Sequence, residues 1–217
     1  MSNTAKAKPQ NIKSAGRPTV EKALEIETKL LRVALAEFLE YGYGDASLTR
    51  IVKNASVSKT TLYSRYSSKD ELFRAIIYQQ INLVNPGAYL PMNASSLNLE
   101  DGLKSYANNM LSLNLQGEML GVNRLIYSEF NRFPELGAAA AERTRMGVER
   151  ITRFIKNCTE ADGSTCKDPA AAAETFIYMI KGWYIDVMLT HQTITPAMQK
   201  QWVERTVHSL VAASIDW

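Results

Sequence analysis

The segment from Ser47 to Leu72, SLTRIVKNASVSKTTLYSRYSSKDEL, is the most informative part of this chain. Apolar residues recur there at helical spacing on either side of a polar break at residues 54–56, namely Leu48, Ile51, Val52, Val57 and Leu62. The pattern predicts two short helices joined by a tight turn. Such a pair is typical of a helix-turn-helix, whose second helix can lie in the major groove of DNA.

The same stretch is rich in cations and poor in anions. Its cations are Arg50, Lys53, Lys59, Arg65 and Lys69, and no acid occurs between Asp45 and Asp70. A run of cations without anions suits a polyanionic partner. Spacing and charge alone also fit a solvated helical hairpin, so at this point both interpretations stay open.

Residues 17–75 resemble the tetracycline-repressor (TetR/AcrR) family of bacterial transcriptional regulators. The resemblance is carried by the run Ala55-Ser56-Val57-Ser58-Lys59-Thr60-Thr61-Leu62-Tyr63, by Ser68-Lys69-Asp70-Glu71-Leu72, and by residues 29–43, which are similar to the first helix of the family. Two positions depart from the family pattern, which usually has Gly where Ser56 stands and Ala where Val52 stands. A non-glycine residue with positive φ costs on the order of 1 kcal/mol, and neither departure removes a DNA-facing group.

Periodicity and resemblance together predict an all-α protein of about nine helices. We expect a disordered basic arm at residues 1–16, a three-helix DNA-binding domain at 17–68, and a helical ligand-binding and dimerisation domain at 69–217. The first helix should span 19–41, with Ser47 and Ser58 capping the next two. The later helices should cover 69–84, 99–113, 120–133, a segment ending near 157, and two segments that begin near Pro169 and Pro196.

The second helix of the motif carries the residues that we expect to read bases. They are Ser58, Lys59, Thr60 and Thr61. Lys59 can meet the N7 and O6 acceptors of guanine, and a threonine methyl can meet a thymine methyl. We expect phosphate contacts, which fix register without reading sequence, from Thr49, Arg50, Tyr63, Arg65 and Lys69. Arg17 could reach into a minor groove, although the basic arm fits a solubilising tail equally well.

A single helix-turn-helix contacts little DNA, so we expect a homodimer on a palindromic operator. The predicted dimer surface lies on the last two helices, at Ile177, Ile180, Tyr184, Val203, Val207, Leu210 and Val211. Two such helices from each subunit form the contact in the family. Internal packing of these residues is the alternative.

The resemblance also implies an effector pocket in the C-terminal domain. Aromatic and apolar residues with one cation suit a largely apolar pocket that has few polar anchors. The candidates are Tyr106, Met110, Arg124, Tyr127, Phe130, Trp183 and Tyr184. Plain core packing is the alternative for each of them. We expect a small, largely apolar effector that releases a repressor from its operator.

Charge and motifs weigh against other classes of function. Residues 1–74 carry 13 Lys and Arg against 8 Asp and Glu, a net charge of +5, and the remainder carries 12 against 14, a net charge of −2. The chain has no Gly-rich phosphate loop, no GxSxG and no HExxH. We therefore expect no enzyme, no cofactor and no metal. Neither a signal peptide nor a run of ~20 apolar residues occurs, which predicts a cytoplasmic protein without a membrane role.

Cys158 and Cys166 are expected to be reduced thiols, with a local redox switch left open. Two rival functions also remain at this stage. One is a DNA-bound structural or cell-division factor on the same scaffold, whose C-terminal domain binds a protein. The other is a helical-bundle enzyme or carrier that has no role on DNA.

Overall fold

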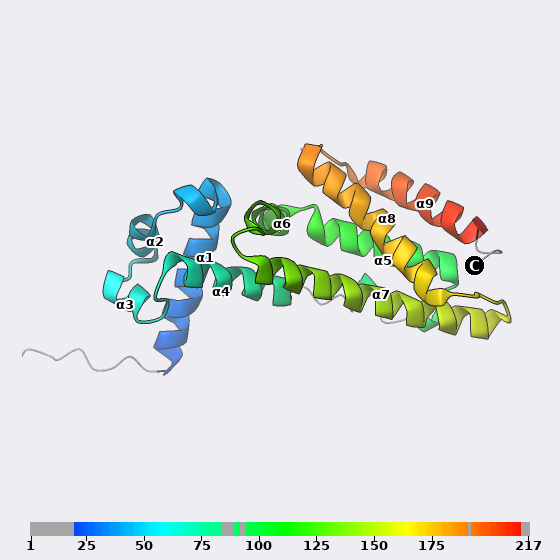
Figure 1. Cartoon of the computed structure of the whole chain (residues 1–217), viewed down its shortest axis with the longest axis horizontal. Helices are drawn as coiled ribbons and strands as arrows, with labels where there is room; N and C mark the ends of the chain where they lie inside the picture. Colours follow the sequence, from blue (N-terminus) through cyan, green and yellow to red (C-terminus); the bar gives the residue numbers. More distant parts are fainter. Residues whose placement is uncertain (1–19, 84–88, 92–93, 191, 214–217) are drawn as a thin grey trace, which may run out of the picture.

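The computed structural model describes residues 20–83, 89–91, 94–190 and 192–213. Within these ranges the chain folds into nine α-helices without any strand (Figure 1), so the predicted all-α class is confirmed. The predicted basic arm and Arg17 lie outside the described residues.

The first four helices are α1 (Val20–Asp45), α2 (Leu48–Ala55), α3 (Lys59–Tyr63) and α4 (Lys69–Leu83). The regular part of α1 ends where the sequence predicts, because Gly42 has φ 70° and ψ 177°. Glycine adopts a positive φ without a Cβ penalty. A last turn beyond this kink extends α1 to Asp45.

Serine caps define α2 and α3, as predicted. The Ser47 hydroxyl accepts from the backbone N–H of Arg50, and the Ser58 hydroxyl accepts from that of Thr61. Ser56 lies between the two helices in the left-handed conformation, with φ 57° and ψ 41°. The two helices and this turn form the predicted helix-turn-helix.

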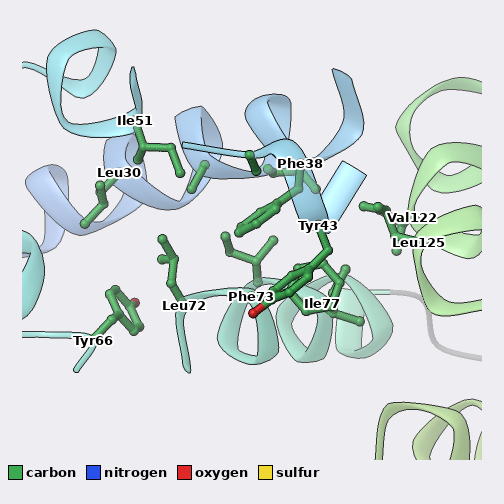
Figure 2. Close-up of a cluster of buried hydrophobic side chains, with 14 of the residues drawn as sticks. Leu30, Phe38, Tyr43, Ile51, Tyr66, Leu72, Phe73, Ile77, Val122 and Leu125 are labelled. Carbon is green, nitrogen blue, oxygen red and sulfur yellow. The ribbon is translucent and has the colours of Figure 1, made fainter. Parts of the chain in front are cut away.

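An aromatic cluster fills the core beneath the helix-turn-helix (Figure 2). The ring of Phe73 lies 5.0 Å from those of Phe38, Tyr43 and Phe133, measured between centroids. Val122 and Leu125 lie at the edge of this cluster in Figure 2. Residues from beyond position 120 therefore complete the core of the first four helices.

The C-terminal part comprises a short 3-10 helix, η2 (Ala94–Ser96), and five α-helices: α5 (Leu99–Asn114), α6 (Gly117–Glu129), α7 (Pro134–Asp162), α8 (Pro169–Thr190) and α9 (Pro196–Ala212). The predicted bounds of two helices need correction. The sixth helix spans 117–129 rather than 120–133. The seventh runs past residue 157 to Asp162, where Gly163 takes a φ of 73° and ends it.

Packing in the C-terminal part bears on the predicted dimer surface. The helix α7 lies against α8, and α5 lies against α9. Six of the predicted interface residues are buried within the single chain: Ile177, Ile180, Tyr184, Val203, Val207 and Leu210. Val211 is half-buried. The buried six serve mainly to pack their own subunit, and their part in a dimer contact stays a prediction.

Candidate nucleic-acid interface and ligand cavity

The short helix α3 is anchored to the protein by one side chain and presents the others to solvent. Leu62 is its single buried residue, whereas Lys59 and Thr60 are exposed and Tyr63 is 51% exposed. Figure 1 shows α3 at the outer end of the molecule, far from α7, α8 and α9. This geometry leaves room for a duplex against α3.

The polar side chains of α3 differ in what already holds them. The hydroxyls of Ser58 and Thr61 lie 2.8 Å apart, and Ser58 also caps the helix. Lys59 has no ion-pair partner among the described residues. Of the four predicted base-reading residues, Lys59 and Thr60 therefore have the most freedom to meet a ligand.

Arg50 is held in place by α1. Its guanidinium lies 2.6 Å from the buried carboxylate of Glu37, donates to the backbone oxygen of Asp45 at 2.7 Å, and lies 4.2 Å from the centroid of the Tyr41 ring. Thr49 is exposed beside it on α2. These contacts fix the direction of the Arg50 side chain at the surface of α2.

Arg65 links the end of α3 to α1. It donates to Glu27 at 2.9 Å and to the backbone oxygen of Ala23 at 3.0 Å, while the Tyr66 hydroxyl donates to the other oxygen of Glu27 at 3.1 Å. Burial raises the pKa of Tyr66 to about 12, and the nearby Glu27 charge adds to this effect. Arg65 therefore has a structural role. The predicted contact between Arg65 and a phosphate would have to form in addition to these bonds.

Lys69 is fixed at the first turn of α4. Its ammonium donates to the backbone oxygen of Gly44 at 2.8 Å and lies 4.8 Å from the centroid of the Tyr43 ring. The hydroxyl of Tyr43 donates to the carboxylate of Asp70. Lys69 therefore approaches the surface beside the N-terminus of α4, an end that favours phosphate.

The acids that orient these cations are absent from the sequence prediction. Glu37 lies between Ala34 and Phe38 on the apolar stripe of α1 and is only 5% exposed. A carboxylate within an apolar stripe requires a buried partner, and that requirement is the signal from which an Arg50–Glu37 pair could have been predicted.

A cavity of about 90 Å³ lies among α5, α6, α7 and α8. It is lined by residues Tyr89, Tyr106, Met110, Asn114, Asn123, Ile126, Tyr127, Ala140, Arg143, Thr144, Gly147, Ile177, Lys181 and Tyr184. Four of the seven predicted pocket residues, Tyr106, Met110, Tyr127 and Tyr184, lie in this wall.

The other three predicted pocket residues lie outside this wall, and a role for them in ligand binding stays a prediction. Phe130 is 52% exposed beyond the end of α6, and Trp183 stacks on Trp202 of α9 with 4.4 Å between ring centroids. Arg124 lies on a different face of α6 from Asn123, and its guanidinium approaches the backbone oxygen of Met188 at 3.5 Å. Helical spacing in the sequence did not distinguish helix faces that line the cavity from helix faces that point elsewhere.

The cations of the cavity are Arg143 and Lys181. The Lys181 ammonium donates to the hydroxyl of Thr144 at 2.8 Å, and burial together with the charge of Arg143 lowers the pKa of Lys181. Arg143 approaches the Tyr89 hydroxyl at 3.5 Å, and its Nε is buried without a hydrogen-bond partner. The sequence signal was Lys181 itself, the only cation of the largely apolar α8.

Other kinds of site find little support in the part of the chain that the structure describes. No group of three or more His, Cys, Asp and Glu side chains could hold a metal ion there. No described helix is long and apolar enough to cross a membrane. Cys158 and Cys166 are free, and burial raises the pKa of both thiols, which disfavours the reactive thiolate.

Two family models match this sequence. Residues 30–76 match the model described as bacterial regulatory proteins of the tetR family. Residues 101–213, more than half of the chain, match the C-terminal domain of AefR-like transcriptional repressors. The two matches cover the helix-turn-helix and the helices around the cavity.

Solved structures share this fold over nearly their whole length. A protein of Mesorhizobium loti MAFF303099 assigned to the TetR family superimposes with a TM-score of 0.73 at 21% identity, covering 88% of this chain and 98% of that one. The flavonoid-responsive regulator FrrA gives 0.65 at 25% identity, covering 87% and 96%. The regulator FadR of Bacillus subtilis, solved with stearoyl-CoA, gives 0.63 at 14% identity, covering 83% and 97%.

Proposed function

This chain belongs to the TetR family of bacterial transcriptional regulators, and from that premise we propose that it is a ligand-responsive repressor. In this proposal two subunits bind a palindromic operator, and a small, largely apolar effector in the cavity releases them. The observation that carries the DNA-binding part is α3, a short helix that projects Lys59 and Thr60 into solvent at the outer end of the molecule.

The helix α6 supports a coupling between cavity and DNA. It contributes Asn123, Ile126 and Tyr127 to the cavity wall. It also packs Val122, Leu125 and Ile126 into the core beneath the helix-turn-helix, so Ile126 belongs to both. A Cβ on Gly121 would lie 2.6 Å from a methyl group of Leu39 on α1, so α6 and α1 touch closely. A ligand that moves α6 must therefore also move or strain α1.

The junction between α6 and α7 supplies a second link. Arg74 of α4 binds the carboxylate of Glu135 at 2.6 Å and lies 4.8 Å from the centroid of the Phe133 ring. Phe133 is buried in the core of the first four helices. Displacement at the start of α7 would thus reach α4, whose first turn carries Lys69.

The proposed release is a two-state equilibrium. One state spaces the two copies of α3 for the operator, and the other does not. An effector shifts this equilibrium only through its different affinities for the two states, and moving the ratio from 1:99 to 99:1 requires about a 10⁴-fold difference. That FrrA responds to flavonoids and that FadR was solved with stearoyl-CoA supports a small-molecule effector here.

Selection of duplexes from a random pool tests the DNA-binding part. We expect an inverted repeat to be enriched, and its affinity should fall steeply with salt because bound Lys and Arg displace counterions. Failure to enrich any duplex, as expected of a helical carrier, would contradict the proposal.

The ligand-binding part requires a separate measurement. Compounds that stabilise the protein should also lower its affinity for the selected repeat. If DNA binding is present but no compound in a broad panel stabilises the protein, the rival interpretation gains, in which the C-terminal domain binds a protein partner.

A further inference from the structure

The charge of the cavity wall tells more about the effector than its apolar residues do. Two cations, Arg143 and Lys181, lie in the wall, and no Asp or Glu is among the described residues that line it. The remaining polar groups come from the tyrosines Tyr89, Tyr106, Tyr127 and Tyr184, the amides of Asn114 and Asn123, and the hydroxyl of Thr144. The cavity therefore carries net positive charge.

Neither cation forms an ion pair with another residue in the described part of the chain. Lys181 has a neutral partner, the Thr144 hydroxyl at 2.8 Å, and the nearest partner of Arg143 is the neutral Tyr89 hydroxyl at 3.5 Å. The Nε of Arg143 is buried and has no hydrogen-bond partner. In contrast, Arg145, two residues along α7, pairs with both Glu142 and Glu149 at the surface.

Two partly buried like charges without a counterion are costly to maintain. Burial and the charge of Arg143 both lower the pKa of Lys181, which is the direction that this cost produces. An anion in the cavity would remove it, since a carboxylate can accept from a guanidinium and an ammonium together. A cationic ligand would meet repulsion from both side chains.

Size and shape restrict the body of the ligand. An apolar cavity of about 150 Å³ is known to admit one benzene ring, and the cavity here measures about 90 Å³. A single ring already requires some widening, which the flexible side chain of Met110 can provide. Four tyrosine rings in the wall suit a flat apolar partner.

We propose that the effector is a small aromatic acid, a single ring bearing a carboxylate that Arg143 and Lys181 bind together. This inference rests on the proposed function, in that it names the class of effector for the same cavity. It differs from that function in requiring a negative charge on the ligand.

The test uses the full chain and a panel of monocyclic aromatic carboxylates, benzoate among them, each paired with its neutral amide. The acid and amide of a pair have nearly the same shape and differ in charge. We expect at least one acid to raise the thermal midpoint of the protein by several degrees at saturation, while its amide has little effect. Equal stabilisation by acid and amide, or no stabilisation by any acid in the panel, would overturn the inference.

Variants locate the effect. Lys181→Met and Arg143→Gln should each weaken binding of the active acid at least tenfold in calorimetry. Arg145→Gln removes a cation from the exposed face of α7, the helix that also carries Arg143, and should leave the affinity for the acid unchanged. If the two cavity variants bind the acid as tightly as the wild type, Arg143 and Lys181 do not recognise it and the inference fails.

The failure of the inference can be told apart from failure of the proposed function. Affinity for the selected repeat is measured with and without each compound. If only neutral compounds release the DNA, the effector is not an aromatic acid, and the protein is still a ligand-responsive repressor. If an acid binds tightly but leaves the DNA affinity unchanged, the cavity does bind aromatic acids, and the proposed release from DNA is refuted.

Discussion

The cations of the proposed DNA-binding surface form two groups, those that bind oxygens of the protein itself and those that do not. Arg50, Arg65 and Lys69 each donate to an oxygen of α1. Lys59 projects from α3 without an ion-pair partner in the described part of the chain. Fixed cations suit phosphates, whose positions repeat along any duplex, and a mobile cation on an exposed helix suits a base edge.

This difference predicts distinct effects of two substitutions. Lys59→Ala should cost about 1–3 kcal/mol on the preferred duplex and relax preference at one base pair. Lys69→Ala should weaken all duplexes about equally and lower the slope of log affinity against log salt by about 1. Fluorescence anisotropy with the selected repeat and its single-base variants measures both.

Lys156→Ala, an exposed lysine of α7, is the matched control and should change neither quantity. Thermal midpoints must accompany the affinities, because Lys69 also holds Gly44. Equal effects of the Lys59 and Lys69 variants on every duplex would refute the division between base and phosphate contacts.

The raised pKa of Tyr43 predicts that the protein loses stability at alkaline pH. Burial, with a contribution from the hydrogen bond to Asp70, raises the pKa of Tyr43 from 10.0 to about 12. A hydroxyl whose folded pKa exceeds its unfolded value stabilises the fold fully below pH 10, and this contribution is lost as pH rises from 10 toward 12. Urea midpoints of the wild type should fall over this range, and those of Tyr43→Phe should fall less.

Tyr63→Phe is the control for this measurement, because the Tyr63 ring is half exposed on α3. Its urea midpoints should follow those of the wild type at every pH. A Tyr43→Phe variant with the full wild-type pH dependence would show that Tyr43 is not responsible.

Among the elements, the turn between α2 and α3 is the clearest case of local strain. Ser56 adopts φ 57°, the one positive value among the described non-glycine residues. Ser56→Gly should therefore raise the free energy of unfolding by roughly 1 kcal/mol, less what glycine loses through its greater freedom in the unfolded chain. Urea denaturation monitored by circular dichroism measures the change.

Ser56→Ala retains a Cβ and should leave stability nearly unchanged. A Gly variant less stable than the Ala variant would mean that the left-handed turn is not strained.

Helix starts with a side-chain cap were predictable from the sequence because such caps are local. Ser47 and Ser58 cap α2 and α3 as expected, and Thr195 caps α9 directly before the predicted start at Pro196. The start of α6 was misplaced by three residues, and its N-cap residue Gln116 forms no side-chain cap bond. Helix ends were harder. The end of α7 depends on the φ of Gly163, and an apolar pattern does not reveal how far beyond its last buried turn, near Ile155, a helix continues in solvent.

In the whole molecule, the apolar periodicity of the sequence identified which helix faces are buried. It did not identify which other helices cover those faces. The apolar faces of α8 and α9 that suggested a dimer pack inside the single chain. Likewise Arg143 and Lys181 come from different helices, 38 residues apart in sequence, and only the folded bundle brings both to one cavity. Such information depends on packing between distant segments.

We propose that the dimer uses the outer face of α8, because the inner apolar faces of α8 and α9 pack within the subunit. Apolar side chains there are exposed, including Tyr178, Met179 and Leu189, the last at 65%. Gly182 lies on the same face with open space around it, which permits close approach. Light scattering should give twice the chain mass of 24.3 kDa for the wild type.

Gly182→Arg and Leu189→Glu should shift this mass toward that of one chain. Leu83→Glu changes an equally exposed leucine at the end of α4 and should remain dimeric. A dimer that resists both α8 substitutions would place the interface elsewhere.

In the proposed function, two copies of α3 read one specific sequence. A competition experiment at physiological salt between the selected inverted repeat and a scrambled duplex of the same composition measures this directly. We expect a preference of about 10³-fold or more for the repeat, and a smaller preference in Lys59→Ala. Equal affinity for the two duplexes would refute specific recognition by α3.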